Sequence, residues 1–354
     1  MLNALFALTC TLSGAQGPAV ELIPLANPPA IGKTSAQQEL HLGGFSGLLF
    51  LKKEGDELFF VTHTDRGPNP KKINGQRPFA LPEFAPELVF FSVTKGQWSI
   101  SKRLPLKLNK DKTITGLPNK EGNEIPVTLT KKALAYDGNG LDLEALALDP
   151  ANGYWMGDEY GPSLLHFDKD GHLVKRLLPG KELPAVYAKR KHNRGFEGIA
   201  VQDGKVYGFL QSPLAQDGLK GRIVEVDLKS LKTTGEYFYP FESKKSDKIG
   251  DVWGLGKGEF LVLEQNDDLG KKSIKKIFKI VLNGSNKEVK KTLITDLSAT
   301  PLRQFEKVEG LTVIDKNILA VITDNDFTIK GSPDVKTGKI PLKEEQSQLG
   351  IIKY

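Results

Sequence analysis

Three glutamates occur at similar places in the sequence, each at the start of a short apolar run. They are Glu144 in "EALAL", Glu197 in "FEGIAV" and Glu309 in "VEGLTV". Carboxylates can bind a hard cation or exchange protons with a substrate, so their recurrence points to metal binding or general acid–base chemistry. The alternative is structural, because a buried glutamate can accept hydrogen bonds from backbone amides and hold neighbouring repeats together.

A second apolar run follows each glutamate and ends in polar residues. The distance from Glu144 to Asp158 is 14 residues, which is the reach of two antiparallel strands joined by a short turn. Both polar ends of such a pair lie at the same edge of a sheet. The predicted metal ligands are Glu144, Asp158, Glu197, Glu309 and Asp324. A set that offers only oxygen favours calcium, with magnesium as the second choice.

The sharpest local motif is "TDRGPN", in which Asp65 and Arg66 precede a glycine and a proline. Arg66 can bind a phosphate or a carboxylate through two parallel hydrogen bonds, and Asp65 can hold the arginine or a metal. The alternative is a turn with an internal ion pair between the two residues. The predicted catalytic residues are Asp65, Arg66, Glu159 and Arg194.

Three more residues near this motif could bind an anionic substrate. Lys71 and Arg77 could attract a polyanion, and His63 is the histidine closest to the motif. The alternatives are a solvated basic face and a histidine that only packs. The predicted substrate-binding residues are thus Lys71, Arg77 and His63.

Several classes of site are excluded. The five histidines show no H-E-x-x-H spacing, no serine lies in a G-x-S-x-G motif, and no Walker A loop or Rossmann fingerprint occurs. Cys10 is the only cysteine, so no disulfide can form within the chain. The net charge of +6 is small, and no pattern of aromatic and basic residues predicts binding to nucleic acid.

These residues need an architecture that brings distant repeats together. Repeat positions at Ser46, Glu144, Glu197, Trp253 and Glu309 are separated by 98, 53, 56 and 56 residues. Units of about 50 residues with four short strands are typical of a β-propeller. We therefore predict an all-β propeller of four-stranded blades, with five clear repeats and five or six blades. The polar segment 106–129 could hide the sixth, and a doubly wound α/β fold would need helical segments that are absent.

The first 15 residues predict a signal peptide. An apolar run from Leu2 to Leu12 leads to small residues, with cleavage near Ala15; the alternative is a buried N-terminal strand. Residues 16–354 would form a single domain, located in the periplasm or secreted. No later segment approaches the roughly 20 apolar residues that a transmembrane helix needs, and we expect a monomer.

The segments "THTDRGPNP", "LDLEALALDP", "GDEYGPSLLHFD", "RGFEGIAV" and "VEGLTVI…ITDND" resemble the phytase-like family described by its esterase-like activity of phytase. The resemblance covers roughly residues 38–354 and implies a secreted or periplasmic propeller that hydrolyses phosphate esters such as phytate. Two positions depart from the pattern, since Ser46 and Trp253 stand where glutamates are expected. The ring of acids would then be incomplete.

The function that we predict is metal-assisted hydrolysis of a phosphoester in a small anionic molecule. One alternative is a non-catalytic propeller of the cell envelope that binds a ligand or a protein. Another is a lactonase or other carboxyl-ester hydrolase.

Overall fold

The structure is a computed structural model that describes residues 17–354 except 121–123, 152, 247 and 285. The predicted signal peptide and its cleavage near Ala15 lie outside the described residues. Across the described ranges, no helix is both long and apolar enough to cross a membrane.

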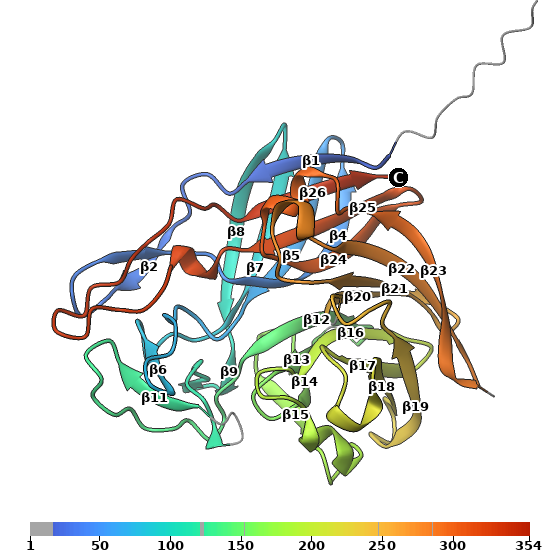
Figure 1. Cartoon of the computed structure of the whole chain (residues 1–354), viewed down its shortest axis with the longest axis horizontal. Helices are drawn as coiled ribbons and strands as arrows, with labels where there is room; N and C mark the ends of the chain where they lie inside the picture. Colours follow the sequence, from blue (N-terminus) through green and yellow to red (C-terminus); the bar gives the residue numbers. More distant parts are fainter. Residues whose placement is uncertain (1–16, 121–123, 152, 247, 285) are drawn as a thin grey trace, which may run out of the picture.

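The predicted all-β propeller is confirmed, and it has five blades within the described residues (Figure 1). Each blade has four antiparallel strands, and a parallel bridge between Phe238 and Glu288 joins the third and fourth blades into one eight-stranded sheet. The first comprises β4 (Phe45–Glu54), β5 (Glu57–Thr64), β7 (Glu87–Thr94) and β8 (Gln97–Pro105). The second comprises β12 (Leu143–Asp149), β13 (Gly153–Asp158), β14 (Ser163–Asp168) and β15 (Leu173–Leu177).

The other three blades follow in chain order. The third comprises β16 (Phe196–Gln202), β17 (Lys205–Leu210), β18 (Lys220–Asp227) and β19 (Thr233–Pro240). The fourth comprises β20 (Lys248–Gly256), β21 (Glu259–Gln265), β22 (Lys275–Asn283) and β23 (Asn286–Asp296). The fifth comprises β24 (Lys307–Asp315), β25 (Ile318–Asp324), β26 (Gln348–Lys353) and β1 (Ala19–Pro24).

The fifth blade closes the ring because its outermost strand comes from the other end of the chain. β1 is antiparallel to β26, with Val20 opposite Ile352. The inner strands β4, β12, β16, β20 and β24 contact one another in sequence, and β24 contacts β4 again. Closure leaves few exposed sheet edges.

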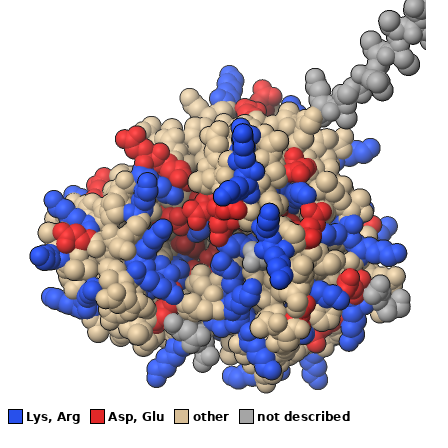
Figure 2. Space-filling model, in the orientation of Figure 1, with Lys and Arg blue, Asp and Glu red and all other residues tan. Residues whose placement is uncertain are grey.

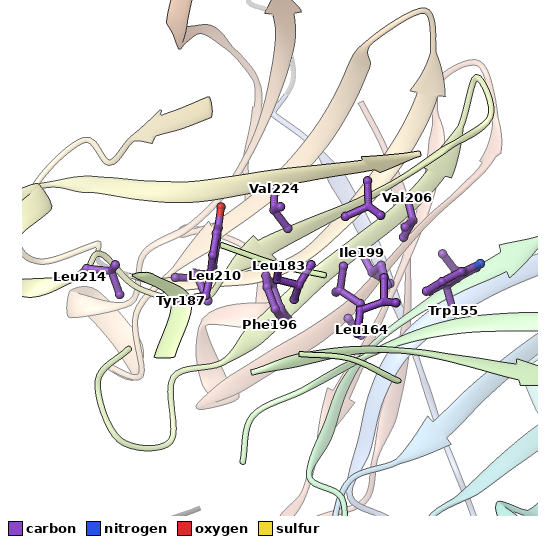
Figure 3. Close-up of a cluster of buried hydrophobic side chains, with 14 residues drawn as sticks. Trp155, Leu164, Leu183, Tyr187, Phe196, Ile199, Val206, Leu210, Leu214 and Val224 are labelled. Atoms are coloured by element: carbon purple, nitrogen blue, oxygen red, sulfur yellow. The ribbon is translucent and has the colours of Figure 1, made fainter. Parts of the chain in front are cut away.

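Packing between neighbouring blades forms the core. The cluster between the second and third blades is representative, with Trp155 and Leu164 facing Phe196 and Ile199 (Figure 3). Four similar clusters fill the other interfaces between blades. Inner positions are therefore covered on both faces: β13 is buried throughout, whereas the outermost strand β8 is largely exposed. Each large apolar side chain buried this way contributes about 1.5–3 kcal/mol.

A β-bulge lies at the repeat position in the inner strands that carry a glutamate. The pairing of β12 with β13 shifts between Leu143 and Ala145, which leaves Glu144 out of the ladder. Glu197 in β16 and Glu309 in β24 occupy the same place. A bulge can redirect a side chain that regular pairing would place elsewhere, and here it does so in three blades.

The predicted repeat position of the fourth blade, Trp253, is wrong. The bulge of β20 lies between Ile249 and Asp251, so Gly250 takes the place of the glutamate. Trp253 pairs regularly with Leu261 and packs against two hydrophobic clusters. Trp253 stands three residues after the true repeat position, in an apolar run that begins at Val252, and this run caused the error.

Segment 106–129 does not form a sixth blade. It contributes β9 (Lys107–Asn109), β10 (Lys112–Thr113) and β11 (Ile125–Thr128). β9 pairs with β10, and β11 pairs in parallel with β6 (Gln76–Phe79). This insertion brings Glu124 into contact with Arg66.

The remaining elements are short. β2 (Ala30–Lys33) pairs with β3 (Glu39–His41). The 3-10 helices are η2 (Ala185–Lys189), η3 (Ala215–Asp217), η4 (Gly270–Lys272), η5 (Pro301–Gln304) and η6 (Asp326–Thr328). The last of these is a left-handed turn, since all three of its residues have positive φ angles between 50° and 64°.

Candidate functional site

The three repeat glutamates converge, as the sequence predicts. Oxygens of Glu144, Glu197 and Glu309 all lie within 4.8 Å of one another. Each side chain comes from the bulge of a different inner strand. Glu197 and Glu309 are buried, and Glu144 is partly exposed. Their role as metal ligands remains a prediction.

Ser46 of β4 joins two of these glutamates. Its hydroxyl lies 2.8 Å from Oε2 of Glu144 and 3.0 Å from Oε2 of Glu309. A hydroxyl has a single hydrogen and can donate to only one of them. Burial raises the pKa of Glu309 to about 7, although Lys307 opposes the rise. Burial, together with the charges of Asp142 and Glu197, also holds the pKa of Glu144 well above its ordinary value.

A second acidic group adjoins the first and shares Glu144 with it. Oxygens of Asp142, Glu144 and Glu159 also lie within 4.8 Å of one another. Asp142 immediately precedes β12 and Glu159 immediately follows β13, and the amide of Glu159 donates to the carbonyl of Asp142 over 2.8 Å. Burial and the charge of Asp142 raise the pKa of Glu159 to about 8, and Arg194 opposes this rise.

Asp142 was missed by the sequence analysis. It stands two residues before Glu144 in an alternating apolar and acidic run. The two-residue period of a strand places alternate side chains on one face, and this was the signal that could have identified it.

Asp158 supports the backbone of this hairpin. Its Oδ1 accepts hydrogen bonds from the amides of Asp142 (3.0 Å) and Tyr160 (3.3 Å), and its Oδ2 accepts one from the Ser163 hydroxyl (3.0 Å). Burial raises its pKa to about 6. Asp158 belongs to neither acidic group, and both of its oxygens accept hydrogen bonds. Its role as a metal ligand stays a prediction.

Asp324 is held by a lysine that the sequence analysis also missed. Nζ of Lys307 donates to Oδ2 of Asp324 (2.6 Å) and to Oδ1 of Asp326 (2.8 Å). The other oxygen of Asp324 accepts the amide of Asp326 at 2.6 Å. Asp324 thus has partners for both oxygens and lies outside the two acidic groups. It is still close enough to Glu309 for its charge to raise the pKa of that residue.

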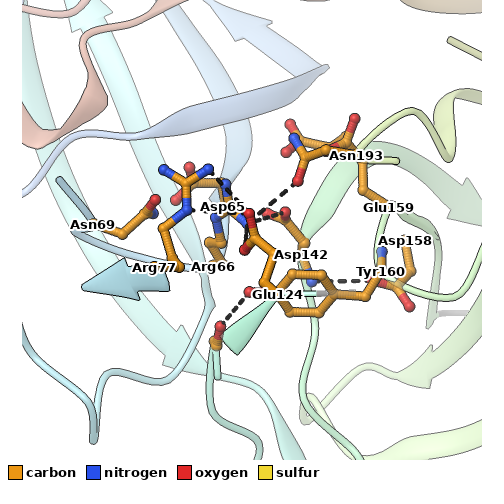
Figure 4. A network of polar contacts seen from close by, with 12 residues as sticks. Asp65, Arg66, Asn69, Arg77, Glu124, Asp142, Asp158, Glu159, Tyr160 and Asn193 are labelled. Atoms are coloured by element: carbon orange, nitrogen blue, oxygen red, sulfur yellow. Dashed lines mark hydrogen bonds and ion pairs between the residues drawn. The ribbon is translucent and has the colours of Figure 1, made fainter. Parts of the chain in front are cut away.

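Arg66 lies at the edge of the second acidic group. Its Nη1 donates to Oε2 of Glu124 (2.8 Å), lies 3.0 Å from Oδ2 of Asp142 and contacts the Asn193 side chain (Figure 4). The guanidinium lies over the ring of Tyr160. The expected alternative of an Asp65–Arg66 ion pair is not found.

Glu124 is surrounded by cations. Its Oε1 accepts hydrogen bonds from Nε (3.1 Å) and Nη2 (3.0 Å) of Arg77 and lies 2.9 Å from Nζ of Lys72 (Figure 4). Burial alone would raise the pKa of Glu124, but Arg66, His192 and Arg77 hold it well below its ordinary value. No local motif surrounds Glu124 in the sequence, so only the fold reveals it.

The other predicted residues take different places. Oδ1 of Asp65 accepts the amide of Gly67 at 2.7 Å and so closes the turn that carries Arg66. Arg194 donates to the carbonyl of Asn193 and is close enough to affect the pKa of Glu159. Lys71 is exposed.

His63 lies inside the first blade and has no exposed surface. Its Nδ1 lies 3.1 Å from the carbonyl of Thr64, and its Nε2 is buried without a hydrogen-bond partner. Burial lowers its pKa to about 4. These facts argue against the predicted contact with a substrate, because the imidazole forms part of the packing.

The surface over this region is hollowed. Figure 2 shows acidic side chains inside a depression near the middle of the visible face, with lysines and arginines around it. A small anion that approaches would meet the basic rim before the acidic floor.

The comparisons with known proteins identify one family and one curated relative. The Phytase-like family, described by esterase-like activity of phytase, matches residues 40–327. An uncharacterized secreted protein of Arthroderma benhamiae is 26% identical over 180 residues, which span 37% of this chain and only 35% of that protein.

Two solved structures have a similar fold. An α-L-arabinofuranosidase of Clostridium thermocellum has a TM-score of 0.44 and 12% identity, covering 78% of this chain and 81% of that chain. Virginiamycin B lyase of Staphylococcus aureus has a TM-score of 0.40 and 12% identity, covering 95% and 99%. The family match extends over most of the propeller, and the chain therefore belongs to the Phytase-like family.

Proposed function

We propose that this chain is a metal-assisted phosphoester hydrolase that acts on a small anionic molecule in the periplasm or outside the cell. The observation that supports this most strongly is a set of buried carboxylate oxygens without hydrogen-bond partners beside a buried arginine. Oε2 of Glu197 and both oxygens of Asp142 have no hydrogen-bond partner, and Arg66 lies next to Asp142.

The residues present fit a hard cation. Glu144, Glu197 and Glu309 offer only oxygens, all close together, and calcium prefers such a set with magnesium as the second choice. The free oxygen of Glu197 is buried, where an unpaired carboxylate is costly. A cation bound by these three glutamates would polarise a phosphoryl oxygen and lower the pKa of a water molecule.

The basic residues of the site would stabilise negative charge on the phosphoryl group. Arg66 is almost buried and is fixed by Glu124, by the ring of Tyr160 and by the turn that Asp65 closes. Charges that are already in place in a site poor in water stabilise a developing charge strongly. Arg194 would add a second positive charge near Glu159.

Lys71 and Arg77 have a supporting part in this proposal. Lys71 is exposed, and Arg77 is mostly occupied by Glu124 and the carbonyl of Pro70. We propose that Lys71 steers an anionic substrate toward the depression, an effect that should weaken as salt is added.

Phosphate release by the purified chain tests the proposal. Phytate and a simple aryl phosphate would be incubated with calcium, with magnesium or with a chelator, and a panel of lactones would be tested in the same buffers. We expect phosphate release that requires calcium and falls at least about 100-fold in Glu197→Gln. Asp251→Asn is the matched control, because Asp251 is a buried inner-strand carboxylate whose two oxygens already accept amides.

Two other outcomes of these assays would identify a different function. Hydrolysis of lactones without phosphate release would identify a carboxyl-ester hydrolase. Calcium binding without any hydrolysis would identify a binding propeller. Either result overturns the proposed phosphoester activity.

A further inference from the structure

We propose that Asp142, Glu144 and Glu159 bind a second divalent cation of the calcium class, so that the centre holds two ions and Glu144 serves both. The inference rests on the proposed function because it concerns the same centre. It adds a site whose ligands come almost entirely from one hairpin of the second blade.

The backbone fixes two of the three ligands. The Glu159 amide donates to the Asp142 carbonyl, so the two residues face each other across the open end of the β12–β13 hairpin. Asp158 binds the amides of Asp142 and Tyr160 and holds both strand ends in place. Little backbone freedom remains to be lost when an ion binds, which favours binding.

The carboxylates of this group lack the partners that buried carboxylates need. Asp142 is 1% exposed and Glu159 is 2% exposed. Oδ2 of Asp142 lies 3.0 Å from Arg66, but Oδ1 has no partner. A buried carboxylate without compensation costs several kcal/mol.

Elsewhere this chain satisfies its buried carboxylates. Both oxygens of Asp251 accept backbone amides at 2.7 Å. Glu264 accepts hydrogen bonds from Tyr239, Ser246, Lys291 and the amide of residue 242. The unsatisfied oxygens of Asp142 and Glu197 therefore belong to this centre and are not a general property of the fold.

Arg194 lies close enough to Glu159 to oppose the rise in its pKa, and the other nearby cations are already engaged. Lys307 binds Asp324 and Asp326, and Lys248 binds Asp267. Arg66 is shared with Glu124. The two acidic groups together contain five carboxylates: Asp142, Glu144, Glu159, Glu197 and Glu309. One divalent cation would offset two of these charges, and a second would bring the total close to balance.

Calcium stoichiometry tests the inference without relying on activity. The full chain would be freed of metal with a chelator, and the number of ions bound would be measured by equilibrium dialysis with radioactive calcium. We expect two ions per chain for the wild type. Asp142→Asn should bind one ion and leave the remaining affinity within about twofold, and Glu197→Gln should also bind one.

Two further variants keep the test decisive. Glu144→Gln should weaken both ions by at least tenfold, since even an outer-shell change costs about 10–100-fold in affinity. Glu159→Gln replaces Asp142→Asn if that variant does not fold, as judged by circular dichroism. Asp251→Asn, the control outside the centre, should bind two ions.

The outcomes separate the two proposals. A single ion in the wild type, unaffected by Asp142→Asn and Glu159→Gln, overturns the second site and leaves the proposed hydrolysis untouched. Protonated carboxyls would then explain the unpaired oxygens. Two ions without release of phosphate from any substrate would support the second site and overturn the proposed hydrolysis.

Discussion

Ser46 occupies in the first blade the repeat position that Glu309 occupies in the fifth, and its hydroxyl lies 3.0 Å from Oε2 of Glu309. The first and fifth blades are neighbours in the closed ring, so the serine faces two glutamates from adjacent blades. The missing glutamate is thus replaced by a hydrogen-bond donor. A carboxylate at this position would be repelled by Glu144 and Glu309, and the serine avoids that repulsion.

Calcium should stabilise the folded protein. A ligand that binds only the native state adds about 2.7 kcal/mol at 100 times its Kd. Urea unfolding of the wild type in calcium and in chelator would measure the gain. Asp251→Asn should show the same gain from calcium as the wild type, and Glu197→Gln should show less. Equal gains in Glu197→Gln and the wild type would contradict the assignment of Glu197 as a ligand.

Cation binding should release protons near neutral pH. Burial raises the pKa of Glu309 to about 7 and that of Glu159 to about 8, so these carboxyls are largely protonated at pH 6 without a cation. Apparent affinity for calcium should rise from pH 6 to 8 and then level off. Calorimetry in two buffers with different ionisation enthalpies measures the proton count, and identical heats in both would refute the prediction.

The same shifts predict how the cation-free protein responds to pH. A carboxyl whose folded pKa lies above its unfolded value favours folding only while it is protonated. Stability of the chelated protein should therefore fall as the pH rises from about 4.5 toward 8. Saturating calcium should flatten this dependence, which denaturant unfolding at several pH values can measure.

His63 should make the protein sensitive to acid. Burial lowers its pKa from 6.5 to about 4, so the folded state needs the neutral imidazole. Its contribution is present above pH 6.5 and is lost as the pH falls toward 4, by up to about 3 kcal/mol. Unfolding curves of His63→Gln should show a weaker pH dependence in this range. His41→Gln, at an exposed histidine, should match the wild type.

Glu124 should be essential for stability. Glu124→Gln leaves Arg66 and Arg77 without their shared carboxylate, and breaking a buried ion pair typically costs about 3–5 kcal/mol. The exposed Glu83 provides a control, and Glu83→Gln should change the free energy of unfolding by less than about 0.5 kcal/mol. A loss below about 1 kcal/mol for Glu124→Gln would show that solvent replaces the carboxylate easily.

Gly44 should tolerate no side chain. Its φ is +63°, and an added Cβ would lie 2.0 Å from the ring of Phe327 in the left-handed turn η6. Gly55 has a similar φ of +58° but open space around it. Gly55→Ala should cost about 1–2 kcal/mol from backbone strain alone, and Gly44→Ala should cost clearly more. Equal losses would mean that η6 moves aside freely.

The sequence predicted the fold class and the convergence of Glu144, Glu197 and Glu309 because both depend on repetition. Residues at the same place in successive repeats lie at equivalent places in successive blades, and so around one axis. This reasoning failed in the fourth blade. The bulge there carries Gly250, which has no acidic side chain to mark it in the sequence, and the nearby Trp253 was aligned in its place.

The rest of the site depends on contacts that no local pattern encodes. Glu124 reaches Arg66 from a polar insertion, and Lys307 reaches Asp324 across two paired strands. Asp158 shows the opposite case: its place at the end of β13 was predicted, but its hydrogen bonds to backbone amides were not. Residue type alone could not distinguish a carboxylate that binds a metal from one that caps a strand end.

The pairing of β1 with β26 has a consequence for how the chain matures. β1 precedes β26 by more than 300 positions along the chain, so it cannot find its partner until β26 has been made. Contacts between such distant segments slow folding. The ring therefore stays open until β26 has been made. Any factor that keeps β1 from pairing elsewhere during that interval should raise the yield of closed molecules.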